Sequence, residues 1–319
     1  LLARLNRVTS PREIYAGSNL IMLQAEQTNE LGGRAWLVPG QSLFEAAAVQ
    51  GINPWVAVLA NQYAGSWQAV PGEVMRLPGA ADAAPSAMPG EVSLVSIDLP
   101  TAQGATLVLK LTSAEGLKLS GSFLEHSLNF FNSSPQEFIA LQGVHAMTEP
   151  GIYPLEIALE RSDGAVLRYA QGVLVNDAGY PLDPVLDVDP ATIDPQVTRP
   201  EDAQWTALAL PVTPEKLWQG GFLSPVAPLY SDCWPSQYGN RRAYNDSPYD
   251  YFHTGLDFCG QVGFDIFAPA DGVVVFAGDL TVRGGATMID HGWGVYTAYM
   301  HQSEHLVQAG DRVQAGQRI

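Results

Sequence analysis

The amino-acid sequence predicts a multidomain, mainly β protein, and three of its features carry this prediction. Its 319 residues are more than one hydrophobic core usually organises. Short segments of alternating apolar and polar residues, separated by Gly, Asn and Pro, recur from residue 91 to the end. Before them lie a compact segment with helix signals and a stretch rich in Ala, Pro and Gly. A hydrophobic content of 46% is enough for a folded chain.

The charge and the apolar runs of the chain limit its partners. The formal net charge is −17, and the 16 Lys and Arg residues form no cluster. Binding to a nucleic-acid backbone needs clustered basic residues, so DNA and RNA are excluded as partners. No run of about 18 apolar residues occurs, so we expect no transmembrane segment. The chain begins Leu1-Leu2 without a start Met, and we expect the numbering to start inside a longer protein.

Residues 35–78 carry the signals of a small βααβ unit. Two short strands are predicted to pair around two helices, at residues 35–38 and 74–77. Ser42 and Glu45 form an S-x-x-E capping box at the start of the first helix, and Gly51 ends that helix. Asn53 and Pro54 then mark the start of the second helix.

Further residues of this unit match a known pattern: Pro39-Gly40-Gln41-Ser42-Leu43, Asn53-Pro54-Trp55, Asn61, Pro71-Gly72, Met75, Leu77 and Pro78. Together they resemble a LysM peptidoglycan-binding module. Residues 1–24 repeat the second half of the pattern, so we expect the C-terminal half of another LysM-like module there. The resemblance implies binding of glycans that contain N-acetylglucosamine. A plain helical hairpin is the alternative interpretation.

The middle of the chain is divided by composition. Residues 79–90 are a linker. Residues 91–176 alternate in short segments, which predicts an immunoglobulin-like β-sandwich with a spacer role. Residues 177–219 are an Asp- and Pro-rich connector with one helix or turn around residues 201–208. From residue 220 onward, strands are punctuated by glycine and aromatic residues, and this last region contains the residues suited to chemistry.

His253 and Asp257 are candidate metal ligands. A neutral imidazole and a carboxylate both suit a borderline cation such as zinc. Gly255 between them allows a tight turn that points both side chains at one place. The H-x-x-x-D spacing alone is a weak signal that often arises by chance.

Three further features of this region bear on a site. Strand alternation places Val295, Thr297, Tyr299 and His301 on one face, and such a polar row indicates either solvent or a site. His291 and His305 are predicted to be structural or exposed. Cys233 and Cys259 are expected to form a disulfide in an exported protein, with two buried thiols as the alternative.

Many motifs of this region occur in one order: F-x-x-P, S-x-(aromatic)-G-x-R, H-x-G-x-D, A-P-x-D-G-x-V, I-D-H-G-x-G, Y-x-H and V-x-x-G-x-x-V-x-x-G-Q. Residues 220–319 therefore resemble the lysostaphin/LytM-type zinc metalloendopeptidases, which are peptidoglycan endopeptidases. The resemblance implies an antiparallel β-sheet groove, a zinc cofactor, His253 and Asp257 as zinc ligands, and His301 as the catalytic histidine. Arg241 matches the arginine of the G-x-R stretch. Arg241, Thr297 and Tyr299 are candidate residues of a substrate groove.

One part of the family pattern is missing from this sequence. The family's third zinc ligand comes from an H-x-H motif, which is expected beyond Ile319. A catalytic zinc normally has three protein ligands and one open position. We therefore expect the active site to be incomplete in the sequence given.

The resulting hypothesis is a secreted bacterial metalloendopeptidase of the cell wall or cell envelope. It binds peptidoglycan glycan strands through LysM-like modules and hydrolyses the peptide cross-links with a zinc-activated water. The first alternative is a catalytically inactive family member that binds the wall or activates another hydrolase. The second is a purely adhesive protein whose last domain is structural.

Overall fold

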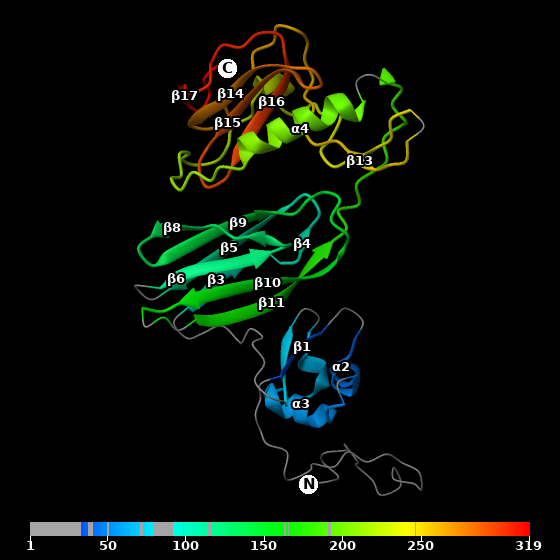
Figure 1. Ribbon diagram of the computed structural model, residues 1–319, viewed down its shortest axis with the longest axis vertical. Helices are drawn as coiled ribbons and strands as arrows, with labels where there is room; N and C mark the ends of the chain where they lie inside the picture. The colour runs from blue at the N-terminus through cyan, green and yellow to red at the C-terminus, as the bar shows by residue number, and fades with distance from the viewer. Residues whose placement is uncertain are drawn as a thin grey trace, which may run out of the picture. The chain divides into compact units, whose positions relative to one another are not determined.

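A computed structural model describes residues 33–37, 41–49, 51–70, 73–78, 92–97, 99–113, 117–162, 164, 166–190, 193–245 and 247–319 (Figure 1). The chain divides into two compact units. The first comprises Leu1–Val144 and Thr148–Asp177, and the second comprises His145–Met147 and Ala178–Ile319. The sequence-based boundary between sandwich and connector, at residue 176, lies next to this division.

The N-terminal described part of the first compact unit has the predicted βααβ arrangement. Its elements are β1 (Gly33–Trp36), α2 (Leu43–Val49), α3 (Pro54–Ala60), a 3₁₀ turn (Ser66–Gln68) and β2 (Val74–Leu77). β1 and β2 pair antiparallel, which confirms the predicted strand pairing with β1 starting two residues earlier than expected. The buried core lies between the helices and the strands and consists of Leu37, Leu43, Ala46, Ala47, Ala57, Val58, Met75 and Leu77.

Local hydrogen bonds explain where these helices begin. The Ser42 amide donates to Glu45 Oε2 and the Glu45 amide donates to Ser42 Oγ, at 2.9 and 3.2 Å, so the predicted capping box is present. The Asn53 side chain caps α3 by accepting from the Trp55 amide. The predictions for residues 1–24 and 79–90 lie outside the described residues.

The other described strands of the first unit form two β-sheets. One sheet has the order β4-β11-β10-β6-β7 and the other has the order β3-β5-β9-β8. Their strands are β3 (Val92–Ile97), β4 (Thr101–Ala102), β5 (Thr106–Ser113), β6 (Lys118–Phe123), β7 (His126–Ser127), β8 (Phe130–Ser134), β9 (Glu137–Gly143), β10 (Gly151–Glu160) and β11 (Val166–Asn176). Alternate residues of β5, β6 and β10 share one buried cluster, so the two sheets enclose a common core. The immunoglobulin-like topology remains a prediction.

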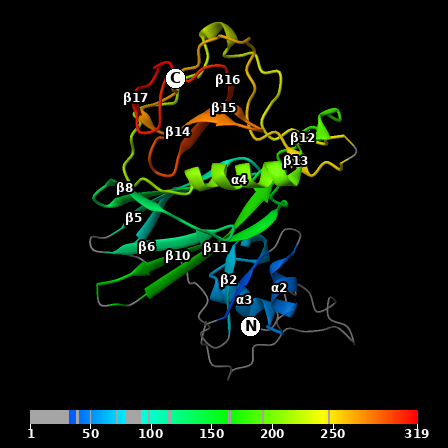
Figure 2. The ribbon, with the colours of Figure 1, turned by 45° about the horizontal axis from the view of Figure 1, so that its top comes forward.

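The second unit contains one helix and a four-stranded antiparallel sheet of order β16-β15-β14-β17. Its elements are α4 (Pro195–Ala209), a 3₁₀ turn (Pro228–Tyr230), β12 (Arg241–Arg242), β13 (Tyr251–Phe252), β14 (Gly272–Leu280), β15 (Gly284–Asp290), β16 (Tyr296–Gln302) and β17 (Arg312–Val313). Figures 1 and 2 both show α4 beside the β14–β15 hairpin. The sheet core contains Ala268, Val274, Ile289, Val307, Val313 and Ile319.

Helix α4 is longer than the sequence predicted. It begins at Pro195 instead of near Glu201, because Asp194 caps it and accepts a hydrogen bond from the Gln196 amide at 2.8 Å. Proline at the first helical position suits this start, whereas Pro200 lies inside the helix and removes one backbone hydrogen bond.

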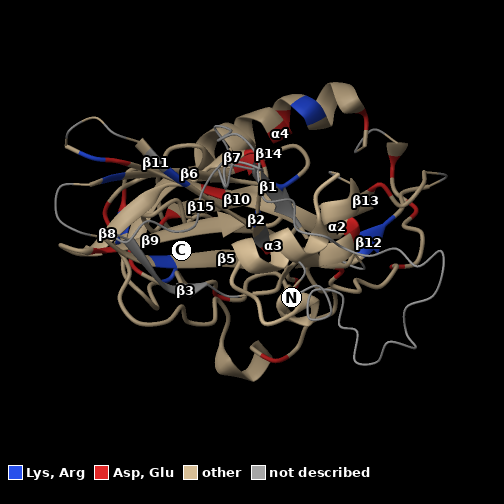
Figure 3. Cartoon of the chain, turned by 90° about the horizontal axis from the view of Figure 1, so that it is seen from below, with Lys and Arg blue, Asp and Glu red and all other residues tan. Residues whose placement is uncertain are grey.

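Basic residues and apolar helices are distributed as follows among the described residues. In Figure 3 the blue positions of Lys and Arg are scattered over several elements, and strand β12 is the short element made of two of them. No single described helix is both long and apolar enough to cross a membrane, although α2 and α3 taken together have sufficient length and apolar composition across a bend of 116°.

Candidate metal site

The structure brings His253 and Asp257 together directly after strand β13. His253 Nε2 lies 3.3 Å from Asp257 Oδ1. The imidazole is nearly buried, with 10% of its side chain exposed, whereas 56% of the Asp257 side chain is exposed. The pair therefore has one fixed member inside the protein and one member that faces solvent.

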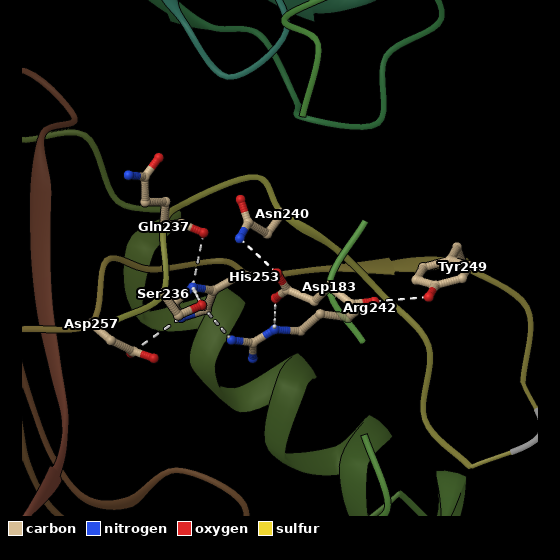
Figure 4. A network of polar contacts seen from close by, with 8 residues as sticks. All are labelled: Asp183, Ser236, Gln237, Asn240, Arg242, Tyr249, His253 and Asp257. Atoms are coloured by element: carbon tan, nitrogen blue, oxygen red, sulfur yellow. Dashed lines mark hydrogen bonds and ion pairs between the residues drawn. The ribbon is translucent and has the colours of Figure 1, made fainter. Parts of the chain in front are cut away.

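The other ring nitrogen of His253 is held by two oxygen atoms. Nδ1 lies 2.9 Å from Ser236 Oγ and 3.0 Å from the Gln237 carbonyl oxygen (Figure 4). A carbonyl oxygen can only accept, so Nδ1 carries the hydrogen and Nε2 presents its lone pair towards Asp257. This tautomer is the one in which a histidine binds a metal through Nε2.

A charged network continues from Ser236 to Arg242 and Asp183. Arg242 Nη2 donates to Ser236 Oγ at 2.9 Å, and Arg242 Nε lies 3.4 Å from Asp183 Oδ2. The Asn240 side chain donates through Nδ2 to Asp183 Oδ1 at 2.7 Å, and the Tyr249 hydroxyl donates to the Asp183 carbonyl (Figure 4). Asp183 therefore fixes Arg242, and Arg242 fixes the serine that contacts the imidazole.

Sequence reasoning selected Arg241 from the Arg-Arg pair and overlooked Arg242. Both residues form strand β12, and neighbouring residues of a strand point to opposite sides. The Arg241 guanidinium donates to the Ala146 carbonyl and to Met147 Sδ, each at 2.7 Å, and its Cζ lies 5.3 Å from the Tyr180 ring centroid. His253 lies opposite Asn240, because its amide donates to the Asn240 carbonyl. Side chains alternate along a strand, so Arg242 points to the same side as Asn240 and His253. This alternation is the signal that could have favoured Arg242.

The geometry of His253 and Asp257 fits two ligands of one zinc ion. Two atoms bound to a tetrahedral zinc at about 2.0 Å lie about 3.3 Å apart, and this is the distance between Nε2 and Oδ1. Without a metal, His253 and Asp257 form an ion pair only when both nitrogens of the imidazole carry a hydrogen. Within the described part of the chain, no group of three or more His, Cys, Asp or Glu residues is placed to hold a metal ion.

A disulfide between Cys233 and Cys259 holds the two segments that form the site. The Cys259 amide donates to the Cys233 carbonyl, and the Asp257 amide donates to the Ser236 carbonyl, both at 2.9 Å. The covalent bridge and these two hydrogen bonds keep the segment of Ser236 against the segment of Asp257.

His301 lies on strand β16 and departs from the predicted alternation. The register between β15 and β16 shifts between Gly285 and Thr287, and His301 has a left-handed φ of 58°. A bulge adds a residue on one strand and turns its side chains, so the face that carries Thr297 and Tyr299 does not extend to His301. The imidazole is exposed, and among the described residues no hydrogen bond or ion pair joins it to His253 or Asp257.

Thr297 and Tyr299 belong to a separate network around buried His291. His291 Nδ1 lies 2.7 Å from the Asp271 carbonyl oxygen, so Nδ1 donates and Nε2 accepts from the Thr297 hydroxyl at 2.8 Å. The Tyr299 hydroxyl donates to Thr297 Oγ1 at 3.0 Å. Burial lowers the pKa of His291 and raises the pKa of Tyr299 to about 12. His291 is thus structural and neutral, which agrees with one of the two roles predicted for it.

Comparison with known proteins finds similarity in the C-terminal part of the chain. Residues 251–319 match Peptidase family M23. His253, Asp257 and His301 lie inside the matched region, whereas Ser236, Arg242 and helix α4 lie before it.

Curated relatives share this part of the sequence. The peptidoglycan DD-endopeptidase ShyA of Vibrio cholerae is 39% identical over 67 residues, which are 21% of this chain and 16% of that protein. The murein hydrolase activator NlpD of Salmonella dublin is 34% identical over 97 residues, which are 30% of this chain and 25% of that protein. The alignments thus span a quarter or less of these two relatives.

A solved structure of a putative peptidase M23 from Pseudomonas aeruginosa is also similar. It has 23% sequence identity and a TM-score of 0.49, and the match covers 70% of this chain and 82% of that one.

Proposed function

We propose that this protein is a zinc-dependent endopeptidase that hydrolyses peptide bonds in bacterial peptidoglycan. The observation that carries the proposal is the His253–Asp257 pair, whose free imidazole lone pair and carboxylate oxygen are separated by the 3.3 Å that a tetrahedral zinc requires. The match to Peptidase family M23 over residues 251–319 supports it.

The residues around the pair have distinct roles in this proposal. His253 binds zinc through Nε2, and Asp257 binds through Oδ1. Ser236 and the Gln237 carbonyl hold the imidazole in the required tautomer and orientation. Zinc, when bound, lowers the pKa of the attacking water and polarises the scissile carbonyl. A third protein ligand is needed, because a catalytic zinc normally has three protein ligands and one open position.

His301 acts in the proposal as an acid–base or hydrogen-bonding group. Its imidazole is exposed on β16 and can therefore meet a bound substrate. A histidine near neutrality can accept a proton from water or donate a hydrogen bond to the developing oxyanion. Water adds across the amide bond, so the products are a carboxylate and an amine.

The cell envelope is the proposed place of action. Relatives named as a peptidoglycan endopeptidase and a murein hydrolase activator support this location. The βααβ unit of residues 35–78 is proposed to bind glycan strands, which would raise the local concentration of the peptide substrate by tethering. Its capping box and closed core support a stable small unit.

Activation of another hydrolase is the second candidate function. Two observations favour it: one relative is named a murein hydrolase activator, and the described residues contain no group of three metal-binding side chains. In this case the C-terminal unit binds a partner or the wall, and no peptide bond is broken.

Hydrolysis of purified peptidoglycan distinguishes the two candidates. Release of new amino groups is measured with wild-type protein, with His253→Ala, and with His126→Ala as a control for loss of an exposed histidine in the other unit. The proposal expects amine release that zinc supports, that His253→Ala abolishes and that His126→Ala leaves unchanged. Amine release at the wild-type rate from His253→Ala contradicts it. Absence of release together with stimulation of an added hydrolase favours the activator.

A further inference from the structure

Helix α4 contacts the sheet through a buried carboxylate as well as through Trp205, whose ring centroid lies 5.9 Å from that of Phe276 on β14. Glu201 is the only buried side chain of the helix, with 7% of the residue exposed. A surface helix normally docks through an apolar stripe, and a buried carboxylate is costly unless it is fully paired. The position of Glu201 therefore has to be explained by what it binds.

Glu201 binds the turn that joins β14 to β15. Its Oε2 accepts from the Val282 amide at 2.8 Å, and its Oε1 accepts from the Arg283 amide at 3.1 Å and from Arg283 Nη1 at 2.8 Å. The hydrogen bonds and the charge of Arg283 outweigh the burial of Glu201 and lower the pKa of its carboxyl. One ionised side chain thus fixes two successive peptide groups of the turn.

The same turn fixes the backbone of His301. The His301 amide donates to the Arg283 carbonyl at 3.0 Å. Gly284 follows with φ of 61°, and a Cβ at this position would lie 3.4 Å from His301 Nδ1. Arg283 is therefore held on both sides, with its amide bound by Glu201 and its carbonyl bound by His301.

His301 needs this support because its backbone is in an unfavourable region. A left-handed φ is strained for a non-glycine residue, and it persists only where its surroundings hold it. The supporting bond at His301 comes from Arg283, at the point where the β15–β16 register shifts. The imidazole direction thus depends on a turn that helix α4 holds.

We propose that Glu201 is a positioning residue for His301, so that helix α4 completes the reactive geometry although it lies before residues 251–319. This inference rests on the proposed function of His301. It assigns to the connector a role in the reaction, in addition to any role in joining the parts of the chain.

The neighbouring Asp202 provides a matched control. Its Oδ1 accepts from Arg283 Nη2 at 2.7 Å, and 58% of its side chain is exposed. Asp202 therefore shares the helix, the charge and the arginine partner with Glu201. Only Glu201 binds the Val282 and Arg283 amides. Glu201→Gln and Asp202→Asn remove the same charge, and only the first disturbs the turn.

The experiment compares these two variants with wild type in the full-length protein by two measurements. Peptidoglycan hydrolysis gives kcat and KM, and amide hydrogen exchange gives the exchange rate of the His301 N–H without any need for activity. We expect Glu201→Gln to lower kcat about ten- to a hundredfold with little change in KM or zinc content, because misplacement of a reacting group by about 1 Å has effects of this size. Exchange at His301 should rise at least about tenfold, as expected for a lost support. Asp202→Asn should match wild type in both measurements.

Several results would overturn the inference. One is unchanged His301 exchange in Glu201→Gln, and another is an equal loss of kcat in both variants. If Glu201→Gln does not fold, Glu201→Asp is used in its place. This variant keeps the carboxylate on a shorter side chain, so it should change kcat and His301 exchange in the same direction but by less than expected for Glu201→Gln. His301→Ala separates the two proposals. Full activity of His301→Ala contradicts the proposed function, whereas the exchange measurement still tests the clamp by Glu201.

Discussion

His253 has one ring nitrogen available for a ligand, because the other is occupied by Ser236 and Gln237. The Gln237 partner is a backbone carbonyl and cannot be removed by substitution. The Ser236 hydroxyl can be removed, and it also accepts from Arg242. Loss of this hydroxyl leaves Arg242 and the imidazole each short of one partner, so the orientation of the metal ligand becomes less defined.

Substitution Ser236→Ala is expected to weaken zinc binding about tenfold or more, because partners that orient a metal-binding histidine contribute to this extent. Zinc affinity is measured by competition with a chelator. Ser231→Ala serves as the control, since the Ser231 hydroxyl donates to the Pro228 carbonyl instead of contacting His253. Equal zinc affinity in Ser236→Ala and wild type would show that the hydroxyl does not orient His253.

His291 predicts a pH dependence of stability. Burial lowers its pKa in the folded state below the ordinary value of 6.5, so the unfolded chain binds the proton more readily. The contribution of neutral His291 is therefore complete above pH 6.5 and is lost as pH falls below it. Urea unfolding at pH 7.5 and pH 5.5 should show a smaller loss for His291→Gln than for wild type. A variant with the wild-type pH dependence would contradict this role, and His126→Gln controls for an exposed histidine.

At the scale of elements, the disulfide is the covalent link between the segments that carry Ser236 and Asp257. Cys233 and Cys259 are 26 residues apart. Closing a loop of this length is expected to stabilise the folded state by about 3 kcal/mol through the entropy of the unfolded chain. The double variant Cys233→Ser/Cys259→Ser should lose about this free energy of unfolding in urea, and should bind zinc more weakly than wild type. A variant with unchanged stability and zinc affinity would show that the bridge is dispensable for the site.

The local features of the fold could be predicted from the sequence. Capping residues such as Ser42 and Asn53 act within four residues, so their hydrogen bonds follow from the sequence pattern. His253 and Asp257 meet across only four positions, so their approach is local in the chain as well.

Long-range pairings could not be predicted in this way. Glu201 binds an amide 81 residues away, and Asp183 binds Arg242 across 59 residues. Nothing local marks these partners, since an acidic residue in a charged helix is ordinarily exposed. The bulge at His301 was also missed, because strict alternation assumes an uninterrupted strand.

At the scale of the molecule, the family match and the folding unit have different limits. The match covers residues 251–319, whereas the compact unit extends back to Ala178 and includes His145–Met147. Ser236, Arg242, Cys233 and helix α4 all lie between Ala178 and residue 251. A match of this extent therefore omits several groups that support the site.

A fragment of residues 251–319 is accordingly expected not to fold by itself, because it lacks the partner of Cys259 and the clamp by Glu201. A fragment of residues 178–319 keeps both and should give a dispersed amide NMR spectrum with a cooperative thermal transition. The shorter fragment should show neither. A dispersed spectrum from residues 251–319 alone would show that the preceding segment is not needed for the fold.

The central claim is that His253 and Asp257 bind a zinc ion that serves peptide hydrolysis. The most direct measurement is the zinc content of the full-length natural protein by elemental analysis, for wild type and for His253→Ala. The account predicts close to one zinc ion per chain in wild type and only traces in the variant. Equal zinc in both proteins, or no zinc in wild type purified with zinc supplied, would contradict it.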